Sequence, residues 1–100
     1  MNIEELVSNV EAWSKAKGLD EADPRAQFLK VIEEVGEIAA AMARGDEPNI
    51  KDGIGDAVVT LIILAQQHNM TLAECLGAAW DEIKDRTGST KDGVFIKDGE

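Results

Sequence analysis

The sequence is poor in cysteine, aromatic residues and long apolar runs. Its single cysteine, Cys75, excludes an internal disulfide and any metal site built from several thiolates. An aromatic content of 4% predicts an aliphatic core. The longest apolar run, from Ala57 to Ala65, is too short to span a bilayer, and the N-terminus lacks the basic, apolar start of a signal peptide. We therefore expect a cytoplasmic protein without a membrane segment.

Basic residues are also scarce. Ten lysines and arginines stand against 20 acids, which gives a formal net charge of −10. This charge disfavours binding to polymeric nucleic acid or to an anionic membrane surface. It is compatible with a small phosphorylated ligand that arrives with divalent cations. The 100 residues are enough for one domain with a modest core.

No strand-like alternation or internal repeat occurs before residue 87. Helix starts are indicated by Asn2, by Asp23 followed by Pro24, by Asn49 and by Thr71. Short loops between helices are typical of an antiparallel bundle. The sequence therefore predicts a single all-α domain over residues 1–100, with an antiparallel four-helix core at 3–17, 24–44, 50–68 and 72–86 and a tail or flap at 87–100.

Apolar spacing predicts which helix sides are buried. Trp13 and Trp80 could stack on a nucleobase, but they lie on apolar sides of the first and fourth helices, so we expect both in the core. The third helix is apolar nearly all round, more than three neighbouring helices can cover, which favours a homodimer. In the second helix the expected core stripe consists of Phe28, Ile32, Val35, Ala39 and Met42.

Two acidic clusters stand out on the second and third helices. Glu33, Glu34 and Glu37 are spaced so that their carboxylates project from one sector of a helix. Asp52 and Asp56 repeat the four-residue spacing on the next helix. Facing one another, the two sectors would offer the hard oxygen ligands that Mg²⁺ or Mn²⁺ prefers. The alternative is a pair of solvated helix faces, which are common opposite a core stripe.

Several other kinds of site are excluded by their missing residues. The only histidine, His68, has no partner glutamate at the spacing of a di-iron bundle, and we expect it at a helix end. A calcium loop starting at Asp52 would need a glutamate where Ile63 stands. Neither a Walker loop nor a Ser/His or Cys/His arrangement is present. What remains is carboxylate chemistry with a metal that polarises a phosphoryl oxygen and activates water, with a spare carboxylate as general base.

The acidic motifs resemble those of a known family. Gln27-x-x-Lys30-x-x-Glu33-Glu34-x-x-Glu37, followed by Ile54-Gly55-Asp56 at the start of an apolar helix, is similar to the MazG-like nucleoside triphosphate pyrophosphohydrolases. The ending resembles small single-domain members, including phage-type ones, through Ala79-Trp80-Asp81-Glu82-Ile83-Lys84-Asp85-Arg86-x-Gly88 and Gly93-Val94-Phe95. The resemblance covers residues 10–97.

The resemblance implies an all-α enzyme that uses Mg²⁺ to hydrolyse a nucleoside triphosphate to the monophosphate and pyrophosphate. It also implies a homodimer or dimer of dimers, with the site near the subunit interface. By position, Glu34, Glu37 and Asp56 would be metal ligands, and Glu33 a ligand or a water-positioning base. Lys30, Lys84 and Arg86 would face phosphates, and Asp81 would reach the metal shell or the sugar.

One position departs from the family pattern. The second acidic motif of the family is Glu-x-x-Asp, and the glutamate position is occupied here by Gly53, with Asp52 one residue earlier. Either Asp52 replaces the missing ligand or it only caps the third helix, in which case Gly53→Glu should restore a ligand. Gly53 itself either allows close helix packing or leaves room beside a ligand. A catalytically weak nucleotide-binding relative and an acidic helical interaction module are the alternatives to an enzyme.

Overall fold

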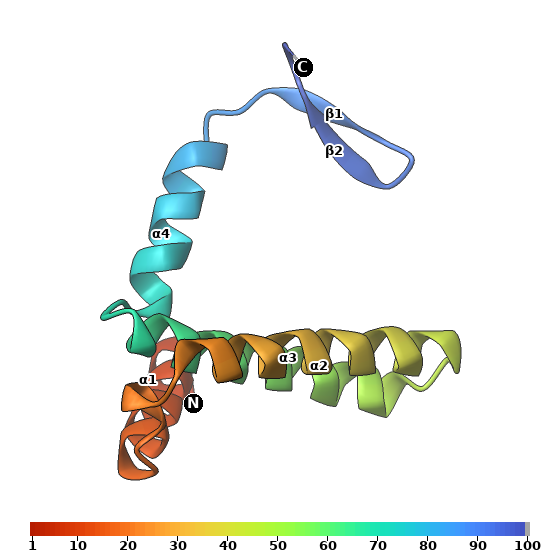
Figure 1. Ribbon diagram of the computed structural model, residues 1–100. Helices are drawn as coiled ribbons and strands as arrows, with labels where there is room; N and C mark the ends of the chain where they lie inside the picture. Colours follow the sequence, from red (N-terminus) through yellow and green to blue (C-terminus); the bar gives the residue numbers. More distant parts are fainter. Residues whose placement is uncertain (100) are drawn as a thin grey trace.

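Two long antiparallel helices, α2 (Pro24–Ala43) and α3 (Glu47–Gln67), form the centre of the molecule (Figure 1). The structure is a computed structural model, and it describes residues 1–99. The side chain of Asp23 caps α2 by accepting a hydrogen bond from the backbone N–H of Arg25 at 2.9 Å. A left-handed Gly45 then ends the helix and begins the short turn into α3.

α3 begins three residues earlier than predicted, and the expected cap at Asn49 is wrong. Asp46 is the N-cap, and its side chain accepts a hydrogen bond from the backbone N–H of Asn49 at 3.3 Å. Pro48 is accommodated in the first turn, where a missing N–H costs no helical hydrogen bond. Asp52 therefore lies in the second turn of α3, beyond the positions from which a side chain caps a helix.

α1 (Ile3–Ala16) and the short 3₁₀ helix η1 (Leu19–Glu21) pack against the C-terminal part of α3. Two glutamine side chains of α3 reach the backbone of this unit. Gln66 Nε2 donates to the carbonyl of Glu11 at 3.2 Å, and Gln67 Nε2 donates to that of Leu19 at 2.9 Å. His68 is the exposed C-cap of α3, as predicted.

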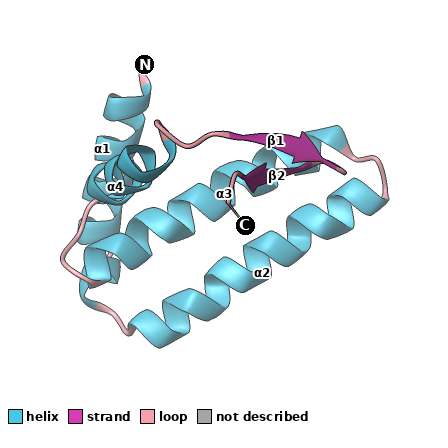
Figure 2. Ribbon diagram, turned by 90° about the horizontal axis from the view of Figure 1, so that it is seen from above, coloured by secondary structure: helices cyan, strands magenta, loops and turns pink. Residues whose placement is uncertain are grey.

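α4 (Leu72–Ile83) rises from the end of α3 on the side of the α2–α3 pair opposite to α1 (Figure 1). It leads to a hairpin of β1 (Gly88–Lys91) and β2 (Val94–Lys97), which stands apart from α2 and α3 in Figure 1 and lies above them in Figure 2. The hairpin is the structure of the predicted tail, whose last residue, Glu100, lies outside the described residues. None of the described helices combines the length and apolar character that crossing a membrane requires.

The predicted all-α class and its four helices are confirmed, and the antiparallel packing is closest between α2 and α3. α4 touches α3 only near their junction, so the molecule is extended. Its radius of gyration is 15.9 Å, against about 13 Å for a compact domain of this length. An apolar cavity of about 480 Å³ is left open between α3 and α4, bordered by Leu61, Leu64, Leu72 and Leu76 among others.

The core of the described chain is small. Its buried apolar side chains come from α2 and α3 alone: Val31, Ala41, Ile62, Ile63 and Ala65. A buried polar contact adds to the helix packing, because Gln27 Nε2 donates to the backbone carbonyl of Thr60 at 3.0 Å. The packed stripe of α2 thus consists of buried Gln27, Val31 and Ala41, with half-buried Glu34 and Ile38 between them.

The predicted core stripe of α2 is wrong. Phe28, Ile32, Val35, Ala39 and Met42 are all exposed, Ile32 to 53% and Met42 to 63%. α3 packs instead on the neighbouring stripe through Val31, which leaves the more apolar side of α2 uncovered. Trp13 and Trp80, also expected in the core, are 50% and 58% exposed.

α3 has an uncovered apolar side as well, formed by Ile54, Val58 and Leu61, so its predicted burial nearly all round does not hold in a single copy. The two uncovered sides together are called the apolar face here: Phe28, Ile32, Val35, Ala39 and Met42 of α2 with Ile54, Val58 and Leu61 of α3. Leu61 also borders the cavity beneath α4, which places this face on the α4 side of the pair.

Candidate metal centre

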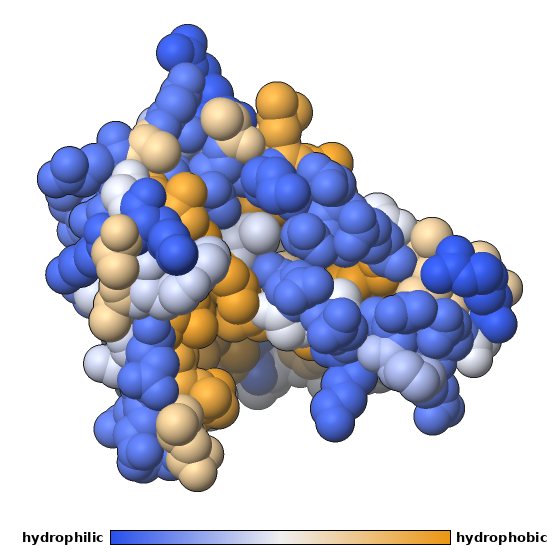
Figure 3. All heavy atoms as spheres, turned by 90° about the horizontal axis from the view of Figure 1, so that it is seen from below, coloured by the Kyte–Doolittle hydropathy of each residue, from blue (hydrophilic) through white to orange (hydrophobic). Residues whose placement is uncertain are grey.

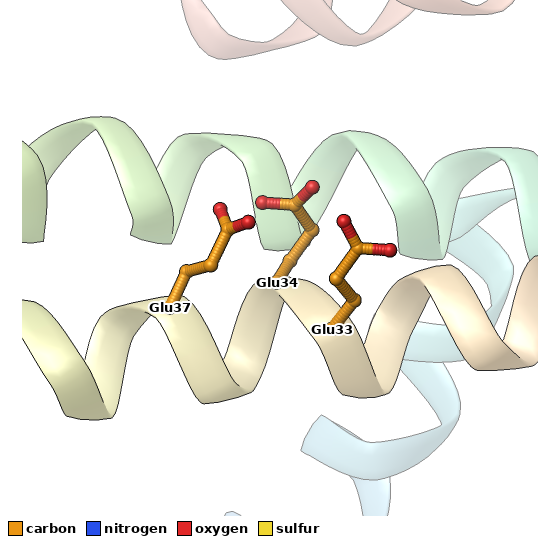
Figure 4. Close-up of side chains that lie close together, drawn as sticks. All are labelled: Glu33, Glu34 and Glu37. Carbon is orange, nitrogen blue, oxygen red and sulfur yellow. The ribbon is translucent and has the colours of Figure 1, made fainter.

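Three glutamates of α2 gather their carboxylates on the opposite side of the pair. One carboxylate oxygen from each of Glu33, Glu34 and Glu37 lies within 4.8 Å of the other two. Figure 4 shows the three side chains rising from α2 toward α3, on the side where α1 lies. Viewed from that side, the end of the α2–α3 pair that extends beyond α1 is mostly hydrophilic (Figure 3).

Glu34 occupies the most unusual environment of the three. Its side chain is half-buried in the packed stripe of α2, and its Oε2 atom is buried with no hydrogen-bond partner. Burial raises the pKa of this carboxyl above its ordinary value. The negative charge of Glu37 raises the pKa further. A side-chain hydrogen bond with Glu37, which requires a proton on one of the two carboxyls, and the charge of Asp56 act in the same direction. The positive charge of Lys30 lowers the pKa.

A buried, unpartnered carboxylate oxygen surrounded by other carboxylates is costly unless a cation or a proton compensates it. Its neighbours supply the hard oxygen donors that Mg²⁺ and Mn²⁺ prefer. The arrangement thus fits a divalent cation, and it differs from a solvated row of glutamates because Glu34 lies between the helices.

α3 contributes two further carboxylates beside this cluster. Asp52 and Asp56 border a polar cavity of about 250 Å³ together with Glu37. The remaining residues of its wall are Ala40, Arg44, Asn49 and Gly53. The structure therefore brings the two predicted acidic clusters to one place. We call Glu33, Glu34, Glu37, Asp52 and Asp56 the acidic face.

The packing around Gly53 leaves little space for a side chain at the position where the resemblance would place a glutamate. The residue is buried against α2, and a Cβ atom added to it would lie 2.8 Å from Ile38 Cγ1. Ile38 therefore fills the space into which a side chain at position 53 would point. A glutamate there would first have to displace Ile38, so the expectation that Gly53→Glu restores a ligand does not fit this packing. Asp52 borders the same cavity as Gly53 and already carries a carboxylate.

The predicted phosphate-facing residues fall in two places. Lys30 lies next to the cluster, with its Nζ 3.4 Å from Glu33 Oε2. Asp81 and Lys84 form an exposed ion pair at 3.3 Å near the end of α4. Arg86 follows α4 and borders a cavity of about 330 Å³ with Ile83 and Phe95. Since α4 stands on the opposite side of the α2–α3 pair from the carboxylates, one copy of the chain does not bring these three residues to the acidic face (Figures 1 and 4).

Two residues of the cavity wall, Arg44 and Asn49, were not predicted as site residues. Arg44 could have been found from its spacing, because it follows Glu37 by seven residues and so returns to the same side of α2 after two turns. Asn49 was assigned to the helix cap, a role that Asp46 fills.

Comparisons with known proteins identify the family. The model of the MazG nucleotide pyrophosphohydrolase domain matches residues 23–89, a range that contains α2, α3 and α4. An uncharacterized 18.2 kDa protein from the rep-hol intergenic region of Haemophilus phage HP1 is 36% identical over 70 residues, which are 69% of this chain. The chain spans 43% of the length of that relative. No solved structure gives a significant match. The chain belongs to the MazG nucleotide pyrophosphohydrolase family.

Proposed function

We propose that this protein is a Mg²⁺-dependent pyrophosphohydrolase that converts a nucleoside or deoxynucleoside triphosphate to the monophosphate and pyrophosphate. The observation that carries the proposal is the buried Oε2 atom of Glu34, which has no hydrogen-bond partner and lies among other carboxylates. Membership of the MazG family supplies the substrate class and the reaction.

Glu34, Glu37 and Asp56 would hold the metal, and Asp52 is a further candidate at the cavity edge. Mg²⁺ bound there would polarise a phosphoryl oxygen and lower the pKa of a bound water. Glu33 is exposed at the rim of the cluster, where its carboxylate can accept a proton from an attacking water. Lys30, three residues before Glu33 on α2, forms an ion pair with it and can also contact a phosphate.

The decisive experiment is a panel of nucleoside and deoxynucleoside triphosphates assayed for pyrophosphate release with Mg²⁺, with Mn²⁺ and with a chelator. We expect release with either metal, none with the chelator, and the monophosphate as the other product. Binding of a nucleotide without turnover would favour the catalytically weak relative. Indifference to both metal and nucleotide would favour the interaction module and contradict the proposal.

We also propose that the protein acts as a homodimer formed through the apolar face. Ile32, Val35 and Val58 are exposed in one copy, and the open cavity beneath α4 continues the same surface. A contiguous apolar surface of this kind marks an interface in a soluble protein. A two-fold partner would cover it with its own copy of the same surface, in an isologous contact.

In such a dimer, α4 of one copy would reach the acidic face of the other. α4 has 12 residues and so extends for about 18 Å. Packed helix layers lie about 8–10 Å apart. An α4 that rises from the interface side would therefore extend past the partner's α2–α3 layer. Its end is followed by Lys84 and Arg86, two cations that are remote from the acidic face of their own chain.

Mixing two inactive variants tests this exchange. Glu34→Gln lacks a metal ligand and Arg86→Ala lacks a phosphate contact, so each homodimer should have little activity. If each site draws these residues from different chains, a heterodimer contains one intact site. Subunit exchange between equal amounts should then restore about a quarter of the parental activity. If both residues serve the site of their own chain, no activity returns, and the α4 exchange is contradicted while the pyrophosphohydrolase proposal stands.

A further inference from the structure

Arg44 is a cation in the wall of an otherwise acidic cavity. It is the C-cap residue of α2, and its side chain borders the cavity of about 250 Å³ together with Glu37, Asp52 and Asp56. Arg25, Lys30 and Lys84 each form an ion pair with a nearby carboxylate. The Arg44 guanidinium forms neither a hydrogen bond nor an ion pair within the described chain. Its donors are therefore available to a ligand in the cavity.

The acidic face has a cation at each end along α2. Lys30 precedes the glutamate cluster and Arg44 follows it, and both lie on the cluster side of the helix. They are 14 residues apart, which corresponds to about 21 Å along the axis. One phosphate group cannot contact both. If both cations contact an extended anion that the carboxylates hold through a metal, they contact different parts of it.

The cavity beside Arg44 suits phosphate groups better than a base. Its wall has no aromatic residue, and its apolar members are only Ala40 and Gly53. Asn49, in the first turn of α3, adds an amide whose nitrogen also donates to Asp46 Oδ2 at 2.6 Å. The positive end of the α3 dipole faces the same region. Nucleobases are usually bound by apolar and aromatic side chains with a few polar groups, which this wall does not offer.

We propose that Arg44 binds the β- and γ-phosphates of the substrate, the part that leaves as pyrophosphate, and that it thereby favours triphosphates over diphosphates. This assignment rests on the proposed function. The planar guanidinium can donate two parallel hydrogen bonds to phosphate oxygens. The carboxylates around it repel a bare polyphosphate, so binding at Arg44 depends on the divalent cation that the acidic face holds.

The competing role for Arg44 is structural, since a cation at a helix C-terminus complements the helix dipole. Lysine would satisfy that role as well as arginine, because the dipole requires only charge. It would not reproduce a two-pronged contact with phosphate. Arg44→Lys and Arg44→Ala together therefore separate the two roles.

Pyrophosphate is the suitable probe, because it is the product common to all nucleoside triphosphates. Its binding to the full chain in Mg²⁺ is measured by calorimetry and as product inhibition. Arg44→Ala should weaken pyrophosphate binding about tenfold to a hundredfold, as expected for the loss of charged hydrogen bonds. Arg44→Lys should recover only part of this loss. Nucleoside monophosphate inhibition should not change, and the preference for triphosphate over diphosphate should narrow by a similar factor.

Arg25→Ala is the matched control, because Arg25 lies at the other end of α2 and pairs with Asp23 at 3.4 Å. Parental pyrophosphate binding in Arg44→Ala would overturn the assignment and leave the proposed function untouched. So would an equal weakening of monophosphate and pyrophosphate binding that Arg44→Lys fully restores, since this indicates the structural role. A parent protein that neither releases nor binds pyrophosphate in Mg²⁺ would overturn the proposed function, and this assignment with it.

Discussion

The acidic face and the apolar face belong to the same two helices, yet each has the opposite kind of unfavourable environment: the first buries a charged group, and the second exposes apolar side chains. On the acidic face, Glu34 is drawn between α2 and α3, where its Oε2 atom has no partner. On the apolar face, Ile32 and Val35 are held out into solvent although nothing in one copy covers them. Both arrangements cost free energy in an isolated chain. The proposed divalent cation would offset the first cost, and the proposed second copy would offset the second.

The packed stripe between the two faces explains how one helix pair can carry both. Val31, Ile38 and Ala41 of α2 meet α3 through small or moderate side chains, and Gly53 lets the backbones approach closely. The contact is narrow, so both neighbouring sectors of each helix remain available. The proposed site and the proposed interface can therefore each be tested by variants on its own side.

The largest effect should come from the acidic face. Glu34→Gln, Glu37→Gln and Asp56→Asn each replace a proposed metal ligand with an amide. We expect each to reduce pyrophosphate release by on the order of 10²-fold or more, while circular dichroism shows an intact helical fold. Glu21→Gln removes an exposed carboxylate of η1 and controls for the loss of one charge. Near-parental activity in all three amide variants would contradict the metal centre.

Ile32→Asp tests the apolar face in the same way. If a second copy covers Ile32, the aspartate becomes a buried, unpaired charge, which costs several kcal/mol. We expect light scattering to show a monomer at micromolar concentration, with an activity loss of about tenfold or more because α4 no longer reaches the partner. Ile32→Val keeps the side apolar and should remain dimeric. A parent protein that is itself monomeric and active would refute the homodimer.

The sequence predicted the helices well because their starts are encoded locally. Asn2, Asp23 and Thr71 each cap the expected helix through a side-chain hydrogen bond. The sequence-based prediction was wrong for the core of α2, where the most apolar stripe of the helix is exposed. Periodicity shows which side of a helix is apolar but not whether the same chain or another copy covers it. Trp13 and Trp80 were misplaced for the same reason.

The candidate site was only partly predictable. The glutamate spacing on α2 fixes one sector whatever the packing, so Glu33, Glu34 and Glu37 could be grouped in advance. The relation of α2 to α3 decides the rest. It places Asp52 at the cavity and leaves position 53 without space, and neither fact can be read from spacing on one helix. Arg44 belongs to no acidic motif; its spacing from Glu37 places it on the same side of α2, and the cavity shows that it borders the acidic face.

Alanine substitutions at the two glycines of α3 test how closely α3 packs against α2. Gly53→Ala places a methyl group 2.8 Å from Ile38 Cγ1, and such overpacking costs about 1–3 kcal/mol, against a helix-propensity gain of up to about 1 kcal/mol. Gly55→Ala meets no atom within 4 Å and should gain about 1 kcal/mol. Urea denaturation should therefore show opposite signs for the two variants. Stabilisation by both would mean that α2 and α3 separate easily, and that Gly53 is not required for their packing.

The smallest effect concerns the stability of the metal-free protein and the pKa of Glu34. Burial and the neighbouring carboxylates raise this pKa above 4.5 in the folded protein, whereas the unfolded chain keeps the ordinary value. Below both values Glu34 is protonated in each state and has no effect. As the pH rises between them, the unfolded state releases its proton first, so the free energy of unfolding falls and stays lower at neutral pH.

Glu34→Gln cannot ionise. With a chelator present, it should therefore melt at a higher temperature than the parent at neutral pH, and the difference should shrink as the pH falls toward 4.5. Mg²⁺ should raise the melting temperature of the parent more than that of the variant, because it binds the folded carboxylate site. A variant less stable than the parent at neutral pH without metal would show that Glu34 is satisfied by the protein alone, and would weaken the case for a cation there.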